Sequence, residues 1–471
     1  MKTLAIIGVL LASVLSAVEE WVFTEEKLLL KNIEEIKIIG IMEKPKIFFI
    51  KEGDVFMNPA SPVKINPDTI IKNFALDGIE VIFWEMDVHL YCVVWCGSNI
   101  KDTSFVNIYY AEIPDTTEQI QIWKINPTQD AYYSSPTIVP YYGGVSVVYE
   151  KNEAGEYKIC ARNKSLEGTV WSGEYEISLS QTSMNRYPEG IKGIFMTIPG
   201  MYTPGIVVWE MFDGNDWEIM MAELMGDSID TIYKVTDNNT DDIRAIPWQS
   251  LFGSQKGIVW RAFDGNDYEI YHMELGKTNV DTITNNSVDD ENPTVNWGYI
   301  INQDTLITLH VVWEALMPNS FEIMHSAKTL DEKWSSPQVI NIPNEVNDIN
   351  PSIGVVKGNL YDSVMVRVVW EREDEGKDAY YVDGKLLGIN EAQVVTTKSI
   401  RVFPNPCRDF VMFIFPEAQN FYIYDISGRI IKKGFAKEYR WFIQRSAGIY
   451  FLKCKNKVFK IVTIKGRQNA P

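Results

Sequence analysis

The sequence predicts an all-β protein in which a β-propeller is followed by a small Ig-like β-sandwich. A valine-rich motif ending in an aromatic residue recurs at intervals of 51 to 60 residues. Turn-forming residues divide each interval into short β-rich runs. Both the repeat and the balance of charge change near residue 398. With 46% apolar and 23% charged residues, the 471-residue chain has the composition of a folded protein.

Residues 1–17 have the order of features found in a signal peptide. Met1-Lys2 gives a positive start, Leu4 to Leu15 is apolar, and Ser16-Ala17 supplies small residues for cleavage. The apolar run is shorter than the roughly 20 residues that span a bilayer. We therefore expect an exported chain with no transmembrane segment after processing.

The repeated motif is a β-branched pair, an aromatic residue and often a glutamate. Consecutive apolar residues of this kind predict a strand that is buried on both faces. A fainter copy is Ile47-Phe48-Phe49. The clear copies are Val93-Val94-Trp95, Val147-Val148-Tyr149-Glu150, Val207-Val208-Trp209-Glu210, Ile258-Val259-Trp260, Val311-Val312-Trp313-Glu314 and Val368-Val369-Trp370-Glu371.

Turns and loops follow each motif in the same order. Asp213-Gly214-Asn215-Asp216 and Asp264-Gly265-Asn266-Asp267 are typical hairpin turns. A further β-rich run leads to an acidic, Asn-containing loop and a proline, as at Asn292-Pro293. Four short strands per repeat are typical of a propeller blade. Residues 18–397 would make seven blades if Ile36 to Ile65 folds as one, and six otherwise; tandem β-sandwiches would not explain the single period.

The motifs VVWE, DGND, EIY and W-S-S-P resemble the sialidase-like, BNR-type propeller repeats of exported bacterial proteins. The nearest matches to the Asp-box of that family are Ser165–Trp171 and Thr329–Trp334. The first is one residue short and has Glu for Asp, and the second lacks the glycine. The resemblance implies the propeller fold, and it keeps a sialidase-like glycoside hydrolase acting on extracellular glycans as the alternative function.

Residues 398–471 form a separate predicted domain. From 399 onward the chain carries 14 basic and 4 acidic residues, a net charge of +10, so the preceding residues have a net charge of −29. Short β-rich runs, such as 410–414, 421–424 and 448–453, predict the β-sandwich.

Three motifs of this domain resemble the type A C-terminal sorting domain of type IX secretion. They are Val402–Pro406, Ile423–Arg429 and Ala447–Leu452, and Cys407 and the last six residues depart from the family pattern. The resemblance implies recognition by the outer-membrane secretion machinery and a secreted or cell-surface protein. A generic Ig-like module is the alternative. The implied sorting residues are Pro404, Asn405, Pro406, Asp425, Gly428, Arg429, Gly448 and Tyr450.

A sialidase-type enzyme would need clustered arginines, a Tyr–Glu pair and an acid at the propeller axis. The body has six arginines, and Arg186 and Arg244 precede Pro188 and Pro247 in successive repeats. We name these two as candidate ligand-binding residues and assign no catalytic residue. We expect a non-catalytic binding or structural role, with a glycan or a surface protein as the partner.

Oxygen-rich turns are the candidate metal sites. Calcium prefers several oxygen ligands, although hairpin chemistry alone also explains such turns. No other cofactor is expected. The candidate calcium ligands are Asp213, Asn215, Asp216, Asp264, Asn266 and Asp267.

The net charge of −19 argues against nucleic acid as a partner, because phosphate binding requires a basic surface. Cys92, Cys96 and Cys160 are expected in the core. Cys407 and Cys454 would be able to pair after export into an oxidising compartment.

Overall fold

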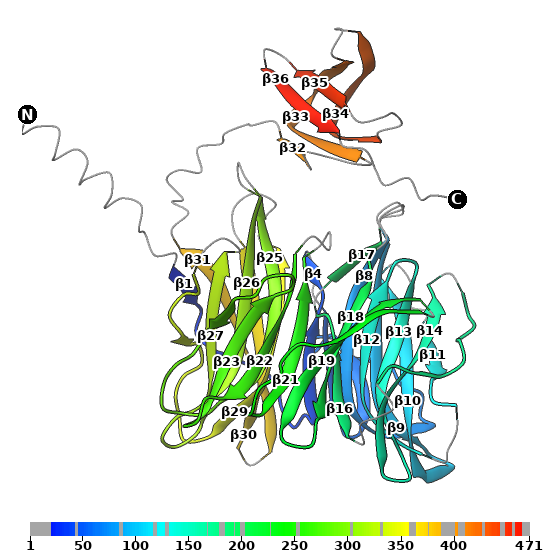
Figure 1. Cartoon of the computed structure of the whole chain (residues 1–471), viewed down its shortest axis with the longest axis vertical. Coiled ribbons are helices and arrows are strands. Elements are labelled where there is room, and N and C mark those ends of the chain that lie inside the picture. Colours follow the sequence, from blue (N-terminus) through cyan, green and yellow to red (C-terminus); the bar gives the residue numbers. More distant parts are fainter. Residues whose placement is uncertain are drawn as a thin grey trace, which may run out of the picture. The chain divides into compact units, whose positions relative to one another are not determined.

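The computed structural model (Figure 1) describes most of the chain between residues 20 and 463. Its elements are β-strands, and among the described residues no helix has the length and apolar character needed to cross a membrane. The described residues are 20–42, 46–83, 88–115, 120–127, 131–166, 168–178, 184–192, 194–197, 203–226, 228–250, 255–301, 305–329, 333–357, 364–374, 376–387, 401–403, 410–425, 429–442, 448–454 and 457–463.

Contacts divide the chain into a larger unit, residues 1–301 and 306–388, and a smaller one, residues 302–305 and 389–471. The described part of the larger unit contains seven sheets, which we number as blades in chain order. Blade 1 consists of β3 (Glu35–Ile39), β5 (Lys46–Lys51), β6 (Asp54–Met57) and β7 (Val63–Lys64). Blade 2 consists of β8 (Ile70–Phe83), β9 (Val88–Asn99), β10 (Asp102–Pro114) and β11 (Gln121–Lys124), with β17 (Ile194–Thr197) added in parallel to β8.

The next four blades each have four strands. Blade 3 consists of β12 (Tyr132–Tyr141), β13 (Gly144–Glu153), β14 (Glu156–Ser165) and β15 (Tyr175–Glu176). Blade 4 consists of β16 (Asn185–Gly190), β18 (Gly205–Phe212), β19 (Trp217–Met225) and β20 (Ser228–Lys234). Blade 5 consists of β21 (Asp242–Gln249), β22 (Lys256–Phe263), β23 (Tyr268–Glu274) and β24 (Val280–Thr282). Blade 6 consists of β25 (Asp290–Ile301), β26 (Thr305–Leu316), β27 (Phe321–Thr329) and β28 (Gln338–Val339).

Blade 7 combines strands from opposite ends of the propeller sequence. Its own strands are β29 (Asn347–Lys357), β30 (Val364–Glu373) and β31 (Lys377–Leu387). The N-terminal strands β1 (Glu20–Phe23) and β2 (Lys27–Leu30) pair with the outer edge of β31, and β4 (Ile41–Met42) pairs in parallel with β29. The N-terminal segment therefore completes the last blade.

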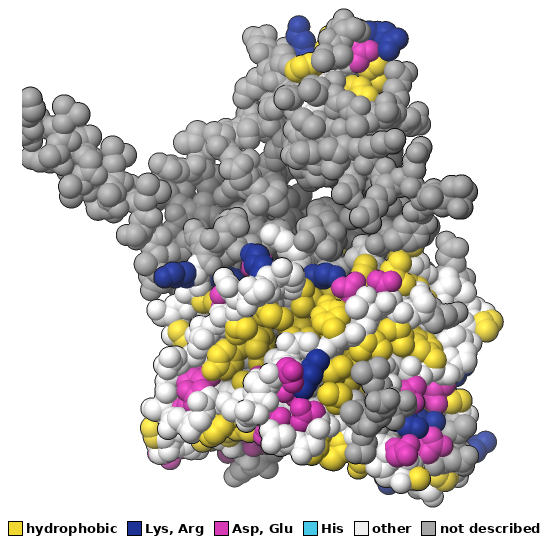
Figure 2. Space-filling model, in the orientation of Figure 1, with side chains coloured by type: hydrophobic (Ala, Val, Ile, Leu, Met, Phe, Trp, Pro, Cys, Tyr) yellow, Lys and Arg dark blue, Asp and Glu magenta, His cyan; other side chains and the backbone are white. Residues whose placement is uncertain are grey.

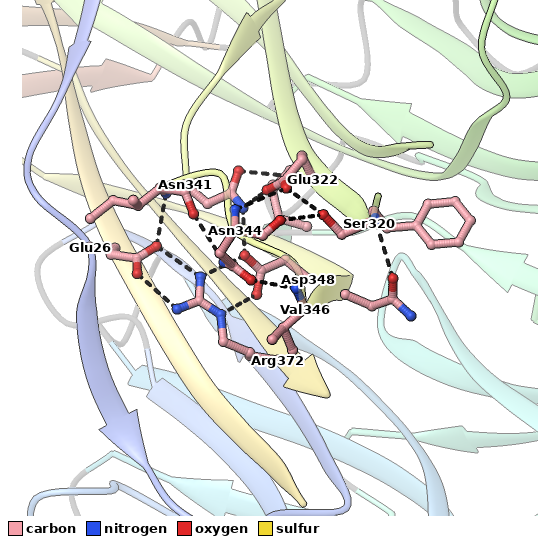
Figure 3. Close-up of polar contacts among 12 residues, drawn as sticks. Glu26, Ser320, Glu322, Asn341, Asn344, Val346, Asp348 and Arg372 are labelled. Carbon is pink, nitrogen blue, oxygen red and sulfur yellow. Dashed lines mark hydrogen bonds and ion pairs between the residues drawn. The ribbon is translucent and has the colours of Figure 1, made fainter. Parts of the chain in front are cut away.

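The seven blades form a closed ring. Each first strand contacts the next in the order β3, β8, β12, β16, β21, β25 and β29, and β29 contacts β3. A ring-closing network, defined by Glu26, Ser320, Glu322, Asn341, Asn344, Asp348 and Arg372, joins the N-terminal segment to blades 6 and 7 (Figure 3). The β-propeller is thus confirmed, with seven blades rather than six, and blade 1 comes from the faint N-terminal copy.

The recurring aromatic residue lies in the second strand of its blade and is buried. Trp95, Trp209, Trp313 and Trp370 are each at most 1% exposed. In three blades the indole N–H donates to a side chain at the start of the same blade's first strand: Trp209 to Asn185, Trp260 to Asp242 and Trp313 to Asp290. The motif therefore aligns the first two strands of a blade as well as filling the space between blades.

Burial raises the pKa of Asp290 from 3.8 to about 7, so this carboxyl makes folding depend on pH. Its stabilising contribution is present below pH 3.8 and is lost as the pH rises through 7. In this window the slope is at most about 1.4 kcal/mol per pH unit. We expect Asp290→Asn to remove that slope, because Asn185 shows that an amide oxygen accepts the same tryptophan bond. Urea unfolding of the wild type and the variant at pH 5 and pH 7.5 checks this prediction. If the free energies of unfolding of the two proteins differ by the same amount at both pH values, the prediction is wrong.

Each first strand from blade 2 to blade 7 contains a non-glycine residue in the left-handed backbone region at the pocket, and β8 has a second one, Lys72. The ladder between the first and second strands shifts register there in blades 2, 3, 4, 5 and 7, which marks a β-bulge. The left-handed residues at the pocket are Ala75, Ser135, Tyr187, Arg244, Asn292 and Asn350, with φ between 45° and 55°. The bulges turn these residues toward the axis of the ring, where all six line one pocket.

The glutamate of the repeated motif connects neighbouring blades. Glu150, Glu210 and Glu314 each accept the backbone N–H of a left-handed residue in a later first strand, those of Tyr187, Arg244 and Asn350. Burial raises the pKa of Glu314 to about 7. At the same place in blade 5 the chain has Arg261, which forms an ion pair with Glu291 of blade 6 at 2.7 Å.

The described part of the smaller unit contains one hydrogen-bonded sheet of five strands: β32 (Arg401–Phe403), β33 (Phe410–Asp425), β34 (Ile430–Phe442), β35 (Gly448–Cys454) and β36 (Lys457–Thr463). The first half of β33 pairs with β32 and its last residues pair with β35. Buried side chains from four strands, including Phe413, Phe421, Trp441 and Leu452, form its core.

Candidate binding site at the propeller axis

A pocket of about 310 Å³ lies at the centre of the ring and is lined by the first strands of all seven blades. Its volume falls at the lower end of the range for small-molecule sites. Glu35 is one of its charged residues, and burial raises the pKa of that carboxyl to about 7. Lys192 lines the pocket as well and forms ion pairs with Asp77 and Glu189, both at 2.7 Å.

A second pocket of about 370 Å³ lies between blades 3 and 4. It shares Ser135 and Tyr187 with the central pocket, so the two spaces adjoin. Aromatic rings contribute much of its lining. The lining includes Tyr132, Glu150, Tyr157, Arg186, Tyr187 and Trp217.

The two candidate arginines converge on Tyr187, which forms the shared wall. The guanidinium carbon of Arg244 lies 4.4 Å from the centre of the Tyr187 ring, and that of Arg186 lies 5.1 Å from it. Arg186 also stacks on Trp217 at 3.5 Å and donates from Nε to Glu210 at 2.6 Å. The guanidinium of Arg244, in contrast, forms no ion pair among the described residues.

Although both arginines lie shortly before a proline, they do not occupy equivalent positions of the repeat. Arg244 has the left-handed backbone of its bulge, and the corresponding residue of blade 4 is Tyr187. Arg186 precedes Tyr187 and therefore corresponds to Ile243. The bulge brings residues from different repeat positions to one wall, which the spacing alone did not indicate.

The carboxylates around Tyr187 are engaged in structural bonds. Glu150 accepts from the backbone N–H of Tyr187 at 3.4 Å, and Glu210 accepts from Arg186 and from the backbone N–H of Arg244. Within the described part of the chain, no hydrogen bond joins the Tyr187 hydroxyl to a carboxylate. The arrangement offers guanidinium and aromatic groups to a ligand.

The candidate metal-binding turns join β18 to β19 and β22 to β23. Gly214 and Gly265 both have φ of 107°, which accounts for the glycine in each turn. Asn215 and Asn266 are exposed and donate their backbone N–H to Asp213 and Asp264. In each turn a glutamate lies close to the two aspartates: Glu218 beside Asp213 and Asp216, and Glu269 beside Asp264 and Asp267. These two glutamates were not among the candidate ligands predicted from the sequence. On the face drawn in Figure 2, acidic side chains gather toward the lower part of the propeller.

Two of the sorting-motif residues form a turn in the smaller unit. Asp425 accepts from the backbone N–H and from Nε of Arg429, at 3.0 and 3.1 Å. Tyr450 is buried, and its ring packs edge-on against Trp441 at 4.9 Å. Gly448 begins β35. Pro404, Asn405, Pro406, Cys407 and Gly428 lie outside the described residues, as does the expected signal peptide at 1–17.

A model of the secretion system C-terminal sorting domain matches residues 401–465. The expected sorting domain is therefore confirmed, and with it export through type IX secretion to the medium or the cell surface. No characterised protein matches the sequence significantly.

Solved structures that match include a sialidase of Trypanosoma rangeli in complex with the inhibitor DANA, at 8% identity and a TM-score of 0.45. The match covers 81% of this chain and 62% of the sialidase, so the chain spans about three fifths of that protein. A puromycin-hydrolysing peptidase of Mycobacterium tuberculosis matches at 9% identity and a TM-score of 0.45, covering 81% of this chain and 57% of the peptidase. The subtype N11 neuraminidase-like protein of A/flat-faced bat/Peru/033/2010 matches at 7% identity and a TM-score of 0.40, covering 77% and 97% of the two chains.

Proposed function

We propose that this exported propeller is a non-catalytic binding protein whose ligand is a carboxylate-bearing glycan. The ligand would occupy the adjoining pockets beside Tyr187, with its carboxylate on Arg244 and Arg186 and a sugar ring against Trp217. The residues that carry this proposal come from blades 3, 4 and 5.

The main support is the guanidinium of Arg244 at the wall of the central pocket, which forms no ion pair with any residue that the structure describes. Its stacking on Tyr187 leaves the N–H groups free to donate, and a guanidinium pairs with a carboxylate through two parallel bonds. Arg186 is already held in place by Glu210 and Trp217, so less of its side-chain freedom would be lost on binding.

Aromatic surface provides the second support. Tyr132 and Tyr187 are exposed, and Trp217 and Tyr157 are half-buried in the same pocket. Exposed rings that keep a polar edge are suited to contact with a sugar, which has apolar C–H faces and polar hydroxyls. Arg186 and Arg244 place two guanidinium groups beside Tyr187, and a guanidinium attracts the carboxylate of a ligand.

Calorimetry on the mature chain with 3′-sialyllactose and tri-galacturonate as probes tests the proposal. We expect one of them to bind, and Arg244→Ala to weaken binding by about 10- to 100-fold through the loss of a charge-assisted pair. The control is Arg367→Ala in blade 7, whose guanidinium is already paired with Asp383, and its affinity should equal that of the wild type.

Equal affinities of the Arg244 and Arg367 variants would contradict the proposed site, as would the failure of both probes to bind. Release of free sugar from sialyllactose by the wild-type chain would replace the binding function with the hydrolase alternative.

A further inference from the structure

We propose that the turns of blades 4 and 5 each bind one Ca²⁺ ion, through Asp213, Asp216 and Glu218 in the first and Asp264, Asp267 and Glu269 in the second. We call these the blade 4 site and the blade 5 site. They are separate from the pockets at the axis, so this proposal does not depend on the glycan ligand.

The geometry of both sites fits a single cation. In each, one carboxylate oxygen from every member lies within 4.8 Å of the others. Two oxygens bound to the same Ca²⁺ at 2.3–2.6 Å are at most about 5 Å apart, so one ion is able to reach all three side chains. The same three positions converge in two blades, which makes a chance cluster a poor explanation.

Most of the buried oxygens of these carboxylates have no partner within the part of the chain that the structure describes. Asp216 and Asp267 are each 5% exposed, and neither carboxylate oxygen of either residue accepts a hydrogen bond from a described residue. Glu218 and Glu269 are 0% and 1% exposed; Oε1 of each accepts a backbone N–H, from Asn238 and Asn286, whereas Oε2 of each has no partner. Burying charged oxygens without partners is costly, and a divalent cation would supply the missing interaction.

At the equivalent turn of blade 6, neighbouring side chains satisfy the polar groups by hydrogen bonds. Ser320 occupies the position of Asp216 and Asp267, and Glu322 the position of Glu218 and Glu269. The Ser320 hydroxyl donates to Glu322 at 2.7 Å, and the other oxygen of Glu322 accepts from Asn341 (Figure 3). In blade 6 the serine and the glutamate therefore satisfy each other with Asn341. In blades 4 and 5 the aspartate brings acceptor oxygens for which the described residues supply no donor.

The two sites differ in one neighbouring side chain. In the blade 4 site the Lys234 ammonium lies 3.0 Å from Asp213 and 3.3 Å from Glu218, so it already offsets part of the negative charge. The corresponding residue of blade 5 is Thr282, because Lys234 pairs with Met220 and Thr282 with Tyr271 in the two ladders. We therefore expect the blade 5 site to bind Ca²⁺ more tightly than the blade 4 site.

Calorimetric titration of CaCl₂ into the chelator-treated mature chain tests the proposal. We expect two binding events, the tighter in the range of about 10⁻⁴ to 10⁻³ M that extracellular modules show. Asp267→Ser should abolish the tighter event and leave the weaker one, because blade 6 shows that serine is compatible with the fold. Lys234→Thr should tighten the weaker event by about tenfold, by removing the competing cation.

A wild-type chain that binds no Ca²⁺ at about 10 mM, well above that range, would overturn the proposal. So would an Asp267→Ser variant that keeps both events. Should this variant fail to fold, as judged by its circular dichroism spectrum, Glu269→Gln removes one ligand at constant volume and must show the same loss. Mg²⁺ at equal ionic strength is the control for a general salt effect.

Discussion

Replacing Arg372 with methionine should destabilise the propeller by about 3–5 kcal/mol, the loss typical of a broken buried ion pair. The Arg372 guanidinium donates to both oxygens of Asp348 and to both oxygens of Glu26 at 2.7–3.0 Å (Figure 3). Asp348 is fully buried, and Glu26 belongs to the N-terminal segment between β1 and β2. The variant would leave two carboxylates without their cation and would remove the side-chain link between the loop that carries Glu26 and blade 7.

Urea unfolding followed by tryptophan fluorescence measures this loss. The matched control is Arg367→Met on the same strand β30, where the arginine forms a bidentate pair with Asp383 inside one sheet. That pair is partly exposed, and its removal should cost no more than about 1 kcal/mol. Equal losses for the two variants would show that ring closure does not depend on Arg372.

The stability lost in Arg372→Met should also depend on pH. Burial raises the pKa of Asp348, and Arg372 opposes that rise. Without the arginine the folded-state pKa should rise further, so stability would be lost as the pH increases through it. We therefore expect Arg372→Met to be more damaging at pH 8 than at pH 5.

The blades were predictable from sequence because their signal is local. A β-branched pair followed by Trp209, Trp313 or Trp370 marks a second strand wherever it occurs, and burial on both faces is what that composition requires. Closure of the ring was not predictable. It pairs Glu20 with Leu387, and nothing in either segment identifies the other as its partner.

The site was only partly predictable, for the same reason. Arg186 and Arg244 could be singled out beside prolines, but they line two different pockets that adjoin at Tyr187. The pocket with Arg186 forms between blades and brings in Trp217 and Tyr132 from elsewhere in the repeat. Glu218 and Glu269 each lie between an aromatic residue and an isoleucine, and nothing in the sequence distinguishes them from exposed polar residues of a strand. Their burial arises from the loops that carry Asn238 and Asn286, which hydrogen-bond to them.

The role of the motif glutamate as an acceptor between blades could not be predicted from the sequence either. In Val207-Val208-Trp209-Glu210 the glutamate follows a core residue and would ordinarily face solvent at the end of a strand. Its actual acceptor role depends on the left-handed bulge of the next blade, which presents an unpaired backbone N–H toward it. Only the arrangement of two successive blades reveals that pairing.

Glu210→Ala is the second change with a large expected effect, because this side chain serves both the fold and the proposed site. It is 1% exposed; Oε1 accepts from the backbone N–H of Arg244 at 2.8 Å and Oε2 from Nε of Arg186 at 2.6 Å. Truncation would leave a backbone donor between blades 4 and 5 unpaired and Arg186 without its carboxylate. Because Arg186 is partly exposed and keeps some hydration, we expect a loss of about 2–3 kcal/mol, below that for Arg372→Met.

Glu150→Ala is the matched control for Glu210→Ala, since Glu150 has the same place in blade 3. It accepts the backbone N–H of Tyr187 at 3.4 Å and forms no ion pair among the described residues, so we expect a loss of about 1 kcal/mol. Urea unfolding gives both values, and calorimetry with the sugar probe that binds gives the second readout. Glu210→Ala should also weaken sugar binding, because Arg186 would no longer be held against Trp217. A Glu210 variant that loses stability but keeps full affinity would mean that Arg186 does not contact the ligand, and would leave Arg244 as the residue that recognises the carboxylate.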